Sequence, residues 1–285
     1  MQTRSLRTLV KIRQVGSFAI AADQLNMTLS AVSMQMKTLE EELNALLFDR
    51  SFRPPKLTPL GRAVSERAVQ LLGAEDDLVR ICSPSDRLVG RFRAGFVSTA
   101  SVRLLPGFLM QAAAVAPRAR FDLQIGLSEA LEEKVLAGQL DFAVLTASSN
   151  PDPRLEYALL REEELAFAVP AHEAGKPLTA IAAQMPFLHF APGTGIGKLI
   201  AKYMSQSDGQ RPEEIIVLDG VEAILECVKA GIGFTLLPVP DISHYGDDRI
   251  TMLQPDGTGL TRQIVLTMLE GSPAHGRRKL LEALF

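Results

Sequence analysis

Residues 16–43 read GSFAIAADQLNMTLSAVSMQMKTLEEEL and decide the fold of the N-terminal part of the chain. A first helical pattern stops at Gly16, a suitable helix C-cap, and Ser17 is a favoured N-cap for a second helix. After a short turn, either Thr28 or Ser30 can cap a third helix. Two short helices joined by a tight turn predict a helix-turn-helix, a motif that places its second helix in the major groove of DNA.

The third helix separates an apolar inward face from a polar outward face. Its inward residues recur at spacings of four, three and four: Val32, Met36, Leu39 and Leu43. Hydroxyls and free N–H groups at a helix start bind phosphate oxygens, and short side chains let a helix settle into the major groove. We therefore expect DNA contacts in this region from Ser17, Thr28, Leu29, Ser30, Ser33, Met34 and Lys37.

A short basic wing is expected after the helix-turn-helix, in the segment DRSFRPPKLT of residues 49–58. Its prolines stiffen the loop and remove hydrogen-bond donors. An arginine there reaches a phosphate or the narrow minor groove. Any one of these cations alone is more often a solvated surface charge, but together they predict DNA contact by Arg50, Arg53 and Lys56. We assign residues 1–58 to a winged DNA-binding domain.

The formal net charge of −3 averages two unlike parts of the chain. Residues 1–67 hold ten Lys and Arg against six Asp and Glu, a net of +4, whereas residues 68–285 hold twenty against twenty-seven, a net of −7. Charge alone leaves chance fluctuation open. A basic head on an acidic body is nevertheless typical of a polyanion-binding module joined to something else.

A long linker helix is predicted after the wing. Thr58 is a suitable N-cap and Pro59 occupies the first helical turn. Apolar positions then alternate at four- and three-residue spacings for about three heptads, which is the pattern of a coiled-coil interface. Packing against the chain's own body is the alternative, but helix-turn-helix proteins usually bind two half-sites as dimers. The linker and hinge cover residues 59–90, with the helix ending at Ser83-Pro84-Ser85. The expected dimerisation residues are Leu60, Val64, Leu71, Leu78 and Ile81.

Residues 91–285 alternate short strand-like runs with helical ones. Strands at 92–97, 121–125 and 141–146, separated by helices, imply a parallel, doubly wound sheet. Such sheets bind ligands beyond the carboxyl ends of their strands. Hydroxyls recur at several of these ends, which suits a small polar or anionic effector such as a carboxylate. Helix capping explains each of these positions taken singly.

The motifs resemble those of the LysR-type transcriptional regulators. In the head the resemblance rests on Gly16-Ser17-Phe18, Ala21-Ala22, residues 30–43, Leu47-Phe48-Asp49-Arg50 and Leu57-Thr58-Pro59-Leu60-Gly61. In the body it rests on Leu104-Leu105-Pro106, residues 138–143 and residues 230–238. Many relatives carry Gln at the place of Leu29 and often Arg at the place of Met34. Gln reads adenine through two hydrogen bonds, whereas Leu offers only apolar contact, for example to a thymine methyl group.

The resemblance implies an α/β multidomain protein: an N-terminal all-α winged helix-turn-helix, a long linker helix that dimerises, and a two-lobed α/β effector-binding domain similar to periplasmic binding proteins. Lobe one covers about 91–162 and 264–285, and lobe two about 163–263. The resemblance places the effector in the cleft between the lobes, contacting Ser98, Thr99, Ala100, Ser101, Thr146, Thr194, Gly195 and Val221. Arg103 is either a counter-charge to an acidic effector or a surface charge.

Catalytic chemistry is not supported by the sequence. The segment PGTGIGK of residues 192–198 fails the P-loop and dinucleotide patterns, and no nucleophile elbow is present. The glutamate runs 40–42 and 162–164 are expected to be solvated faces. The four histidines lack metal-ligand spacing, so we expect neither a metal nor a cofactor.

The expected function is effector-modulated transcriptional regulation by operator DNA binding. Its partners would be double-stranded operator DNA, a small-molecule effector, further copies in a homodimer or homotetramer, and RNA polymerase if the protein is an activator. Two distant cysteines and no long apolar run predict a cytoplasmic protein without a membrane partner. The alternative is a small-molecule binding protein whose head serves only oligomerisation.

Overall fold

The computed structural model describes residues 2–82, 86–148, 150–206, 212, 214–255 and 259–285. The chain forms two compact units, residues 1–84 and 85–285. Within the described residues, no helix is both long enough and apolar enough to cross a bilayer.

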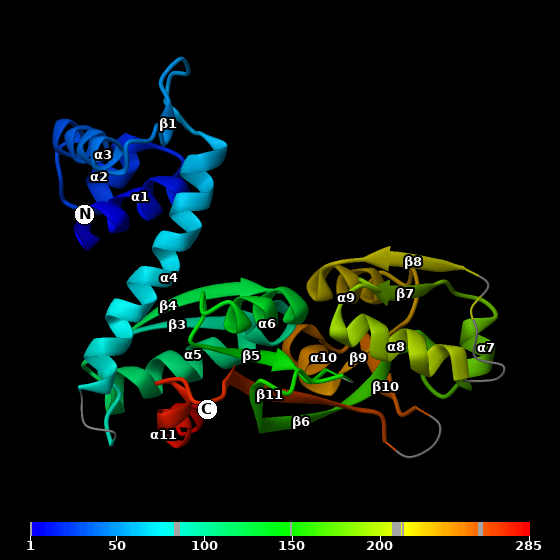
Figure 1. Ribbon diagram of the computed structural model, residues 1–285. Coiled ribbons are helices and arrows are strands. Elements are labelled where there is room, and N and C mark those ends of the chain that lie inside the picture. The colour runs from blue at the N-terminus through cyan, green and yellow to red at the C-terminus, as the bar shows by residue number, and fades with distance from the viewer. Residues whose placement is uncertain (1, 83–85, 149, 207–211, 213, 256–258) are drawn as a thin grey trace. The chain divides into compact units, whose positions relative to one another are not determined.

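The N-terminal unit consists of three short helices, a two-stranded hairpin and one long helix (Figure 1). Their bounds are α1 Thr3–Val15, α2 Phe18–Gln24, α3 Leu29–Leu43, β1 Phe48–Asp49, β2 Lys56–Leu57 and α4 Pro59–Ile81. Strands β1 and β2 pair antiparallel, so residues 50–55 form the loop of a wing. The expected end of α4 at residues 83–85 lies outside the described residues.

Caps delimit the helices of the head as the sequence predicts. Gly16 ends α1 with φ +66° and donates its N–H to Ile12 O at 2.8 Å. Ser17 Oγ accepts from the N–H of Ile20 at 3.4 Å, at the start of α2. Thr28 Oγ1 accepts from the Ala31 N–H at 3.1 Å, so Thr28 rather than Ser30 caps α3.

The core of the head is the inward face of α3 packed against α1, α2 and the first half of α4. Val32, Met36 and Leu39 are fully buried, as the periodic pattern predicts, whereas Leu43 at the C-terminal end of α3 is exposed. Helix α4 contributes Ala68 to this core, and Gly61 lets α4 pass the chain just before β1, since a Cβ there would lie 2.1 Å from Leu47 O.

The C-terminal unit is a mixed α/β structure built on one long sheet (Figure 1). Its strands are β3 Gly90–Val97, β4 Ala119–Gly126, β5 Phe142–Thr146, β6 Leu155–Pro170, β7 Phe187–Phe190, β8 Ile215–Leu218, β9 Thr235–Pro238, β10 Ile250–Leu253 and β11 Thr261–Leu269. Its helices are α5 Ser98–Val115, α6 Ser128–Leu136, α7 Leu178–Ala182, α8 Gly195–Gln206, α9 Val221–Lys229, α10 Val239–Tyr245 and α11 Arg278–Glu282, with short 3₁₀ turns η1 Ala171–Glu173 and η2 His275–Arg277.

The expected parallel βαβαβ arrangement is confirmed for the first three strands of the unit, but the sheet as a whole is mixed. Strands β3, β4 and β5 are parallel, as are β7 and β8. Strand β11, however, pairs antiparallel with both β5 and β6, and β6 also pairs antiparallel with β9 and β10. The long strands β6 and β11 run side by side in opposite directions, which a simple βαβ repeat does not produce.

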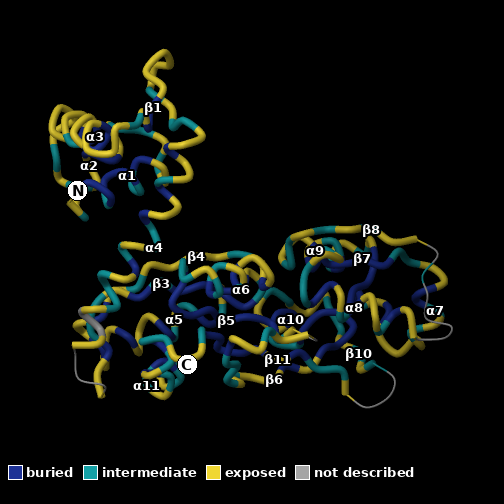
Figure 2. The backbone as a smooth tube through the Cα atoms, viewed as in Figure 1, coloured by how far each residue is buried: buried dark blue, intermediate teal, exposed yellow. Residues whose placement is uncertain are grey.

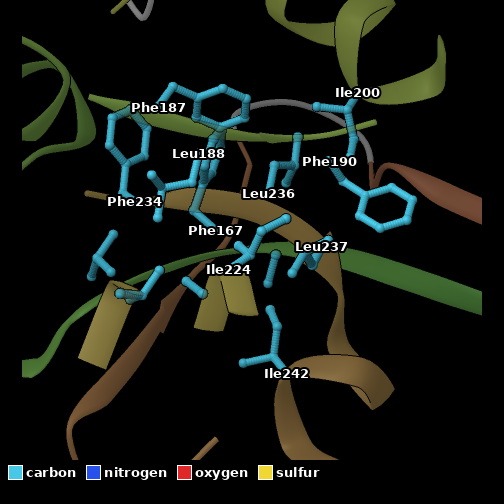
Figure 3. Close-up of a cluster of buried hydrophobic side chains, with 14 of the residues drawn as sticks. Phe167, Phe187, Leu188, Phe190, Ile200, Ile224, Phe234, Leu236, Leu237 and Ile242 are labelled. Atoms are coloured by element: carbon cyan, nitrogen blue, oxygen red, sulfur yellow. The ribbon is translucent and has the colours of Figure 1, made fainter. Parts of the chain in front are cut away.

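The two larger apolar cores of the C-terminal unit lie along this sheet, and we call the regions around them lobe one and lobe two. A smaller core around Leu131 lies between α6, β5 and β11. Lobe one packs α5 against β3 and β5 around Phe92, Phe96 and Phe108. Lobe two packs α8, α9 and α10 around β7, β9 and the second half of β6; Figure 3 shows its Phe187 and Phe234 near Leu236. Figure 2 shows the buried backbone following the central strands of both lobes.

Candidate functional site

The outward face of α3 is open to solvent (Figure 2). All ten expected DNA contacts lie in the N-terminal unit. Ser17 is half-buried and the other nine are exposed: Thr28, Leu29, Ser30, Ser33, Met34, Lys37, Arg50, Arg53 and Lys56. The largest apolar side chains among them are Leu29, 51% exposed, and Met34, 71% exposed.

Hydroxyl groups at the start of α3 are partly committed to local hydrogen bonds. Thr28 Oγ1 caps the helix and lies 3.1 Å from Ser30 Oγ. Gln35 turns toward α1, where its Oε1 accepts from the Thr8 hydroxyl at 2.7 Å. Lys37 Nζ is 3.7 Å from the Glu41 carboxylate one turn further along the same face. This pair is exposed, so solvent screens it and Lys37 remains able to meet a phosphate.

The wing presents its cations unequally. Lys56 Nζ lies 4.5 Å from the centre of the Phe52 ring, a cation–π contact at the loop. Arg50 instead donates to Glu40 Oε2 at 2.8 Å. Glu40 Oε1 accepts from the N–H groups of Leu47 and Phe48 at 2.8 and 3.0 Å. Glu40 is therefore a buried anchor between α3 and the wing, and the expectation that residues 40–42 are all solvated is wrong for this residue.

The two lobes meet where β5 ends and α8 begins. A Cβ built on Gly195 would lie 3.5 Å from Thr146 Cβ and 4.0 Å from Ser128 Oγ. The Ser128 hydroxyl accepts from the Thr146 N–H at 3.2 Å. The Thr146 hydroxyl itself is buried and has no hydrogen-bond partner among the described residues. Lobe one thus places Thr146 against lobe two through its Cβ and methyl group, and the same residue carries a buried hydroxyl without a partner among the described residues.

Other expected effector contacts are more dispersed. Ala100 packs in the core of lobe one, and Ser101 Oγ donates to Ser98 O at 2.9 Å within α5. Thr194 Oγ1 caps α8 by accepting from the Gly197 N–H at 2.9 Å. Val221, at the start of α9, packs against the core of lobe two. The structure brings Thr146 and Gly195 together, whereas the side chain of Ala100 points into the core.

A group of four charged residues joins the lobes, and we call it the lobe-junction ion cluster. It consists of the buried Glu163 on β6, Asp241 on α10 and Arg262 on β11, and the partly buried Arg103 on α5. Arg103 donates to Asp241 Oδ1 at 2.7 Å and to Glu163 Oε1 at 2.9 Å. Arg262, whose side chain is 0% exposed, donates to Glu163 Oε2 at 2.7 Å and to Asp241 Oδ2 at 3.1 Å.

Two sequence expectations fail at this cluster. Arg103 is neither a surface charge nor a free counter-charge, because two carboxylates already neutralise it. Glu163 is buried although Glu162 and Glu164 are exposed, since alternate residues of a strand face opposite sides. Sequence reasoning also missed Ser128 and Arg262. Strand alternation identifies one inward glutamate in the run, but no local signal pairs it with Arg262, 99 residues away.

The two carboxylates of the cluster differ in acidity. Burial raises the pKa of Glu163, but hydrogen bonds and charge from Arg262 and Arg103 outweigh it and hold that pKa below its usual value. Burial raises the pKa of Asp241 above its usual value, and here the same arginines only partly compensate. The difference follows burial first, since Asp241 is the more deeply buried of the two. It also follows the contacts, because Glu163 accepts three N–H groups and Asp241 two.

Arg262 also acts on an expected effector residue. Its Nη1 donates to Thr99 Oγ1 at 3.0 Å. Because arginine has no acceptor, the Thr99 oxygen must accept, and the hydroxyl hydrogen is left to point elsewhere. Among the described residues, no side chain caps the N-termini of α5 and α6. Their first backbone N–H groups are therefore further hydrogen-bond donors, like the Thr99 hydroxyl.

The expected dimerisation residues of α4 are not all equivalent. Val64 packs against the core of the head, as part of the face that meets α1. Leu60, Leu71, Leu78 and Ile81 are exposed instead. Ion pairs from Arg7 to Glu75 and from Arg13 to Glu66, at 2.8 and 2.9 Å, hold α4 on α1. Packing within the chain therefore covers one face of α4 and leaves four of the five expected residues uncovered.

Two family models match this arrangement. One, described as a bacterial regulatory helix-turn-helix protein of the lysR family, matches residues 3–62. The other, the LysR substrate binding domain, matches residues 85–284. The chain belongs to the LysR family. It is a LysR-type DNA-binding transcriptional regulator with a two-lobed α/β domain for a small-molecule effector.

Known relatives of this LysR-type regulator agree in length and fold. The transcriptional regulator CzcR of Bacillus cereus is 29% identical over 250 residues, 86% of this chain and 82% of CzcR. BenM of Acinetobacter baylyi is 29% identical over 268 residues, 90% of this chain and 87% of BenM. The structure of full-length CbnR with its target DNA superposes with a TM-score of 0.69 at 22% identity, covering 99% of each chain. These relatives are transcriptional regulators and not enzymes.

Proposed function

We propose that this regulator responds to a small carboxylate or similar anion bound where lobe one meets lobe two. The observation that carries the proposal is Thr146: its hydroxyl is buried and without a partner among the described residues, and its Cβ and methyl group lie beside Gly195 at the start of α8. A buried hydroxyl left unbonded costs free energy, so such a group is expected to gain its partner from a ligand.

The surrounding donors favour an acceptor ligand. Thr99 is set as a donor by Arg262, and the first turns of α5 and α6 offer uncapped N–H groups. Helix N-termini attract anions through their free N–H groups and dipoles. The proposed effector contacts are Ser98, Thr99, Thr146, Thr194, Gly195 and Val221, with Ala100 and Ser101 contributing through their backbone. The lobes would divide near residues 163 and 263.

On the DNA side, we propose that residues 1–58 bind operator duplex through α3 and the wing. The basic net charge of the head supports this, as does the exposure of Ser33, Lys37, Arg53 and Lys56. Phosphate contacts position the head, and groove contacts of α3 select the sequence. As a DNA-binding protein, the regulator would work in the cytoplasm, without catalysing a reaction, and would contact RNA polymerase if it activates.

We further propose a homodimer, or a tetramer built from dimers, that forms through α4 within residues 59–90. The support is the line of exposed Leu60, Leu71, Leu78 and Ile81 on a face that α1 does not cover. Exposed apolar side chains at heptad spacing are stabilised by a second helix. Two heads would then read two half-sites about one helical turn apart.

The effector proposal is tested with an isosteric pair of variants. Thr146→Val removes the unbonded hydroxyl, and Thr267→Val removes another buried, unpartnered hydroxyl on β11. Both variants should fold at least as stably as the wild type, because each removes an unsatisfied group. A thermal-shift screen of benzoate, small dicarboxylates and amino acids should then give a shift for wild type and Thr267→Val only. A shift that persists in Thr146→Val contradicts the proposed site.

The DNA proposal is tested by footprinting the full-length protein on the DNA upstream of its own gene at low salt. We expect a protected inverted repeat with binding that weakens steeply as salt rises. The matched variant Lys37→Met/Arg53→Met/Lys56→Met should fold normally and lose protection. If folded wild-type protein protects no repeat, the DNA proposal is wrong, and a head that serves only oligomerisation is favoured.

A further inference from the structure

The exposed face of α3 carries two large apolar side chains on either side of a polar and basic strip. At about 100° per residue, Leu29, Ser33, Lys37, Ser30 and Met34 fall within an arc of about 140°. Leu29 and Met34 lie at the two margins of this arc and the polar residues lie between them. Both apolar side chains are largely exposed, at 51% and 71%.

Loose packing does not explain these exposed side chains. The same helix buries Val32, Met36 and Leu39 completely. Leu29 lies at the edge of that buried stripe, about 20° around the helix axis from Met36, whereas Met34 lies about 160° from Met36. Single exposed apolar side chains are common on protein surfaces. Here two of them border one polar and basic helix face, so that face offers a partner apolar contacts together with positive charge. Binding a partner on the outward face of α3 would therefore remove apolar surface area from water.

Few groups on this face discriminate bases by hydrogen bonding. Ser33 is exposed there, but a serine hydroxyl fits more than one base. Gln35 is turned toward α1 and bound to Thr8. The Thr28 hydroxyl caps the helix and contacts Ser30. Lys37 is a point charge suited to phosphate, or to a guanine edge only by a single side chain. What remains at the two margins is apolar contact.

One base offers an apolar group in the major groove. Thymine carries a C5 methyl there, whereas the other three bases present only donors and acceptors. We propose that Leu29 and Met34 select the operator by packing on thymine methyl groups, one near each margin of α3. This inference rests on the proposed binding of duplex DNA by the head and names the feature of DNA that it reads.

The charges around the face favour DNA over a protein as the occupant. The head carries a net of +4 over residues 1–67, and the cations Arg53 and Lys56 of the wing belong to the same unit. A polyanion with apolar groups in its groove matches both properties. The unbranched Met34 side chain can adapt to the position of a methyl group.

The test removes the methyl group from DNA instead of changing the protein. Full-length protein first selects sites from a randomised duplex library at low salt. The strongest site is then synthesised with each thymine replaced singly by uracil, which lacks only the C5 methyl. At one or two thymines per half-site, uracil should weaken binding about fourfold for each methyl lost. The salt dependence should stay unchanged, because no phosphate contact is altered.

Variants then assign each methyl to a side chain. Leu29→Ala and Met34→Ala should each bind thymine and uracil equally at one position and keep the discrimination at the other. Both side chains are exposed, so truncation leaves no cavity in the core. Leu46→Ala is the matched control: Leu46 is 72% exposed but lies beyond the C-terminal end of α3, so it should keep full discrimination.

The outcomes separate the two levels of the proposal. If the protein selects no site, the proposed DNA binding itself fails. If it selects a site that binds equally well with uracil throughout, DNA binding stands and methyl readout is overturned. Discrimination that survives in the Leu29→Ala/Met34→Ala double variant overturns the assignment to these side chains.

Discussion

The recognition face of α3 and the lobe-junction ion cluster use charge in opposite ways. On α3, Lys37 and Glu41 stand in solvent 3.7 Å apart, where screening makes their attraction small. In the cluster, Arg262 is fully buried and each of its partners lies within 3.1 Å. The first pair can exchange partners for a phosphate at little cost, whereas the second cannot lose one without leaving a charge unpaired.

The contrast teaches which residues report on binding and which report on folding. A change on the α3 face alters what DNA meets and leaves the core of the head intact. A change in the ion cluster alters the stability of the whole C-terminal unit first, and any effect on regulation follows from that. The three tyrosines, Tyr157, Tyr203 and Tyr245, all lie in the C-terminal unit, and the chain has no tryptophan. Tyrosine fluorescence therefore follows unfolding of that unit alone.

The largest effect is expected for Arg262→Met. It leaves Glu163 and Asp241 with one arginine, the partly buried Arg103, so the free energy of unfolding of the C-terminal unit should fall by roughly 3 kcal/mol. Urea denaturation of the full chain, followed by tyrosine fluorescence, measures this. Arg154→Met is the control, since Arg154 makes an exposed pair with Asp152 and should change little. A negligible change for Arg262→Met would show that water reaches the cluster.

The two carboxylates of the cluster should respond unequally to neutralisation. Glu163→Gln should lower the free energy of unfolding by about 2 kcal/mol, because the pKa of Glu163 is lowered and its charged form is stabilising. Asp241→Asn should cost less than about 1 kcal/mol, because the pKa of Asp241 is raised and burial already disfavours its charged form. Urea titrations at pH 7 compare the two variants directly.

Lowering the pH should change the two stability gaps, wild type minus Glu163→Gln and wild type minus Asp241→Asn, in opposite directions. The stability supplied by ionised Glu163 is present above its ordinary pKa of 4.5 and is lost as pH falls through its lowered folded value. The gap between wild type and Glu163→Gln should therefore shrink below about pH 4.5. Folded Asp241 takes up a proton more readily than the unfolded chain, so the gap to Asp241→Asn should widen. Parallel gaps at all pH values would contradict the assignment.

The two regions also differ in how far the sequence predicts them. The helices of the head follow local signals: Gly16 and Thr28 mark helix boundaries, and the spacing of Val32, Met36 and Leu39 identifies the buried face. Every term in that argument lies within a few residues along the chain. Even there, the burial of Glu40 was not predicted. Glu40 belongs to a run of three glutamates, and only its contacts with the wing show which of the three is buried.

The ion cluster could not be predicted in the same way. Glu163 and Arg262 are 99 residues apart, and Thr99 and Arg262 are 163 residues apart. They meet because β6 and β11 run antiparallel, and the alternation of strands and helices suggested a parallel sheet instead. The resemblance to a family supplied the two-lobed fold and the cleft positions, such as Thr146. It did not supply the partners that polarise Thr99 or leave the Thr146 hydroxyl unbonded.

An intermediate effect is expected for the caps of the head. Thr28→Ala removes the 3.1 Å bond to the Ala31 N–H and should lower the local free energy of unfolding of α3 by about 1 kcal/mol. Ser17→Ala should cost less at α2, because its bond to Ile20 is longer, at 3.4 Å. Hydrogen–deuterium exchange of peptides covering 18–24 and 29–43 measures both. Faster exchange at α2 in Ser17→Ala than at α3 in Thr28→Ala would reverse the expected order.

The smallest effect concerns the exposed pair on α3 and tests the contrast most directly. If Lys37 exchanges Glu41 for a phosphate, Glu41→Gln should raise DNA affinity about twofold at low salt, because the competing charge is gone. Lys37→Met should lower affinity and reduce the slope of log affinity against log salt by about one. Neither variant should alter hydrogen–deuterium exchange of the peptide covering residues 29–43. Glu133→Gln, the same change of charge on α6, should leave affinity unchanged. If Glu41→Gln instead destabilises α3, the pair behaves as a structural bridge, and the difference between the exposed face and the buried cluster is one of degree.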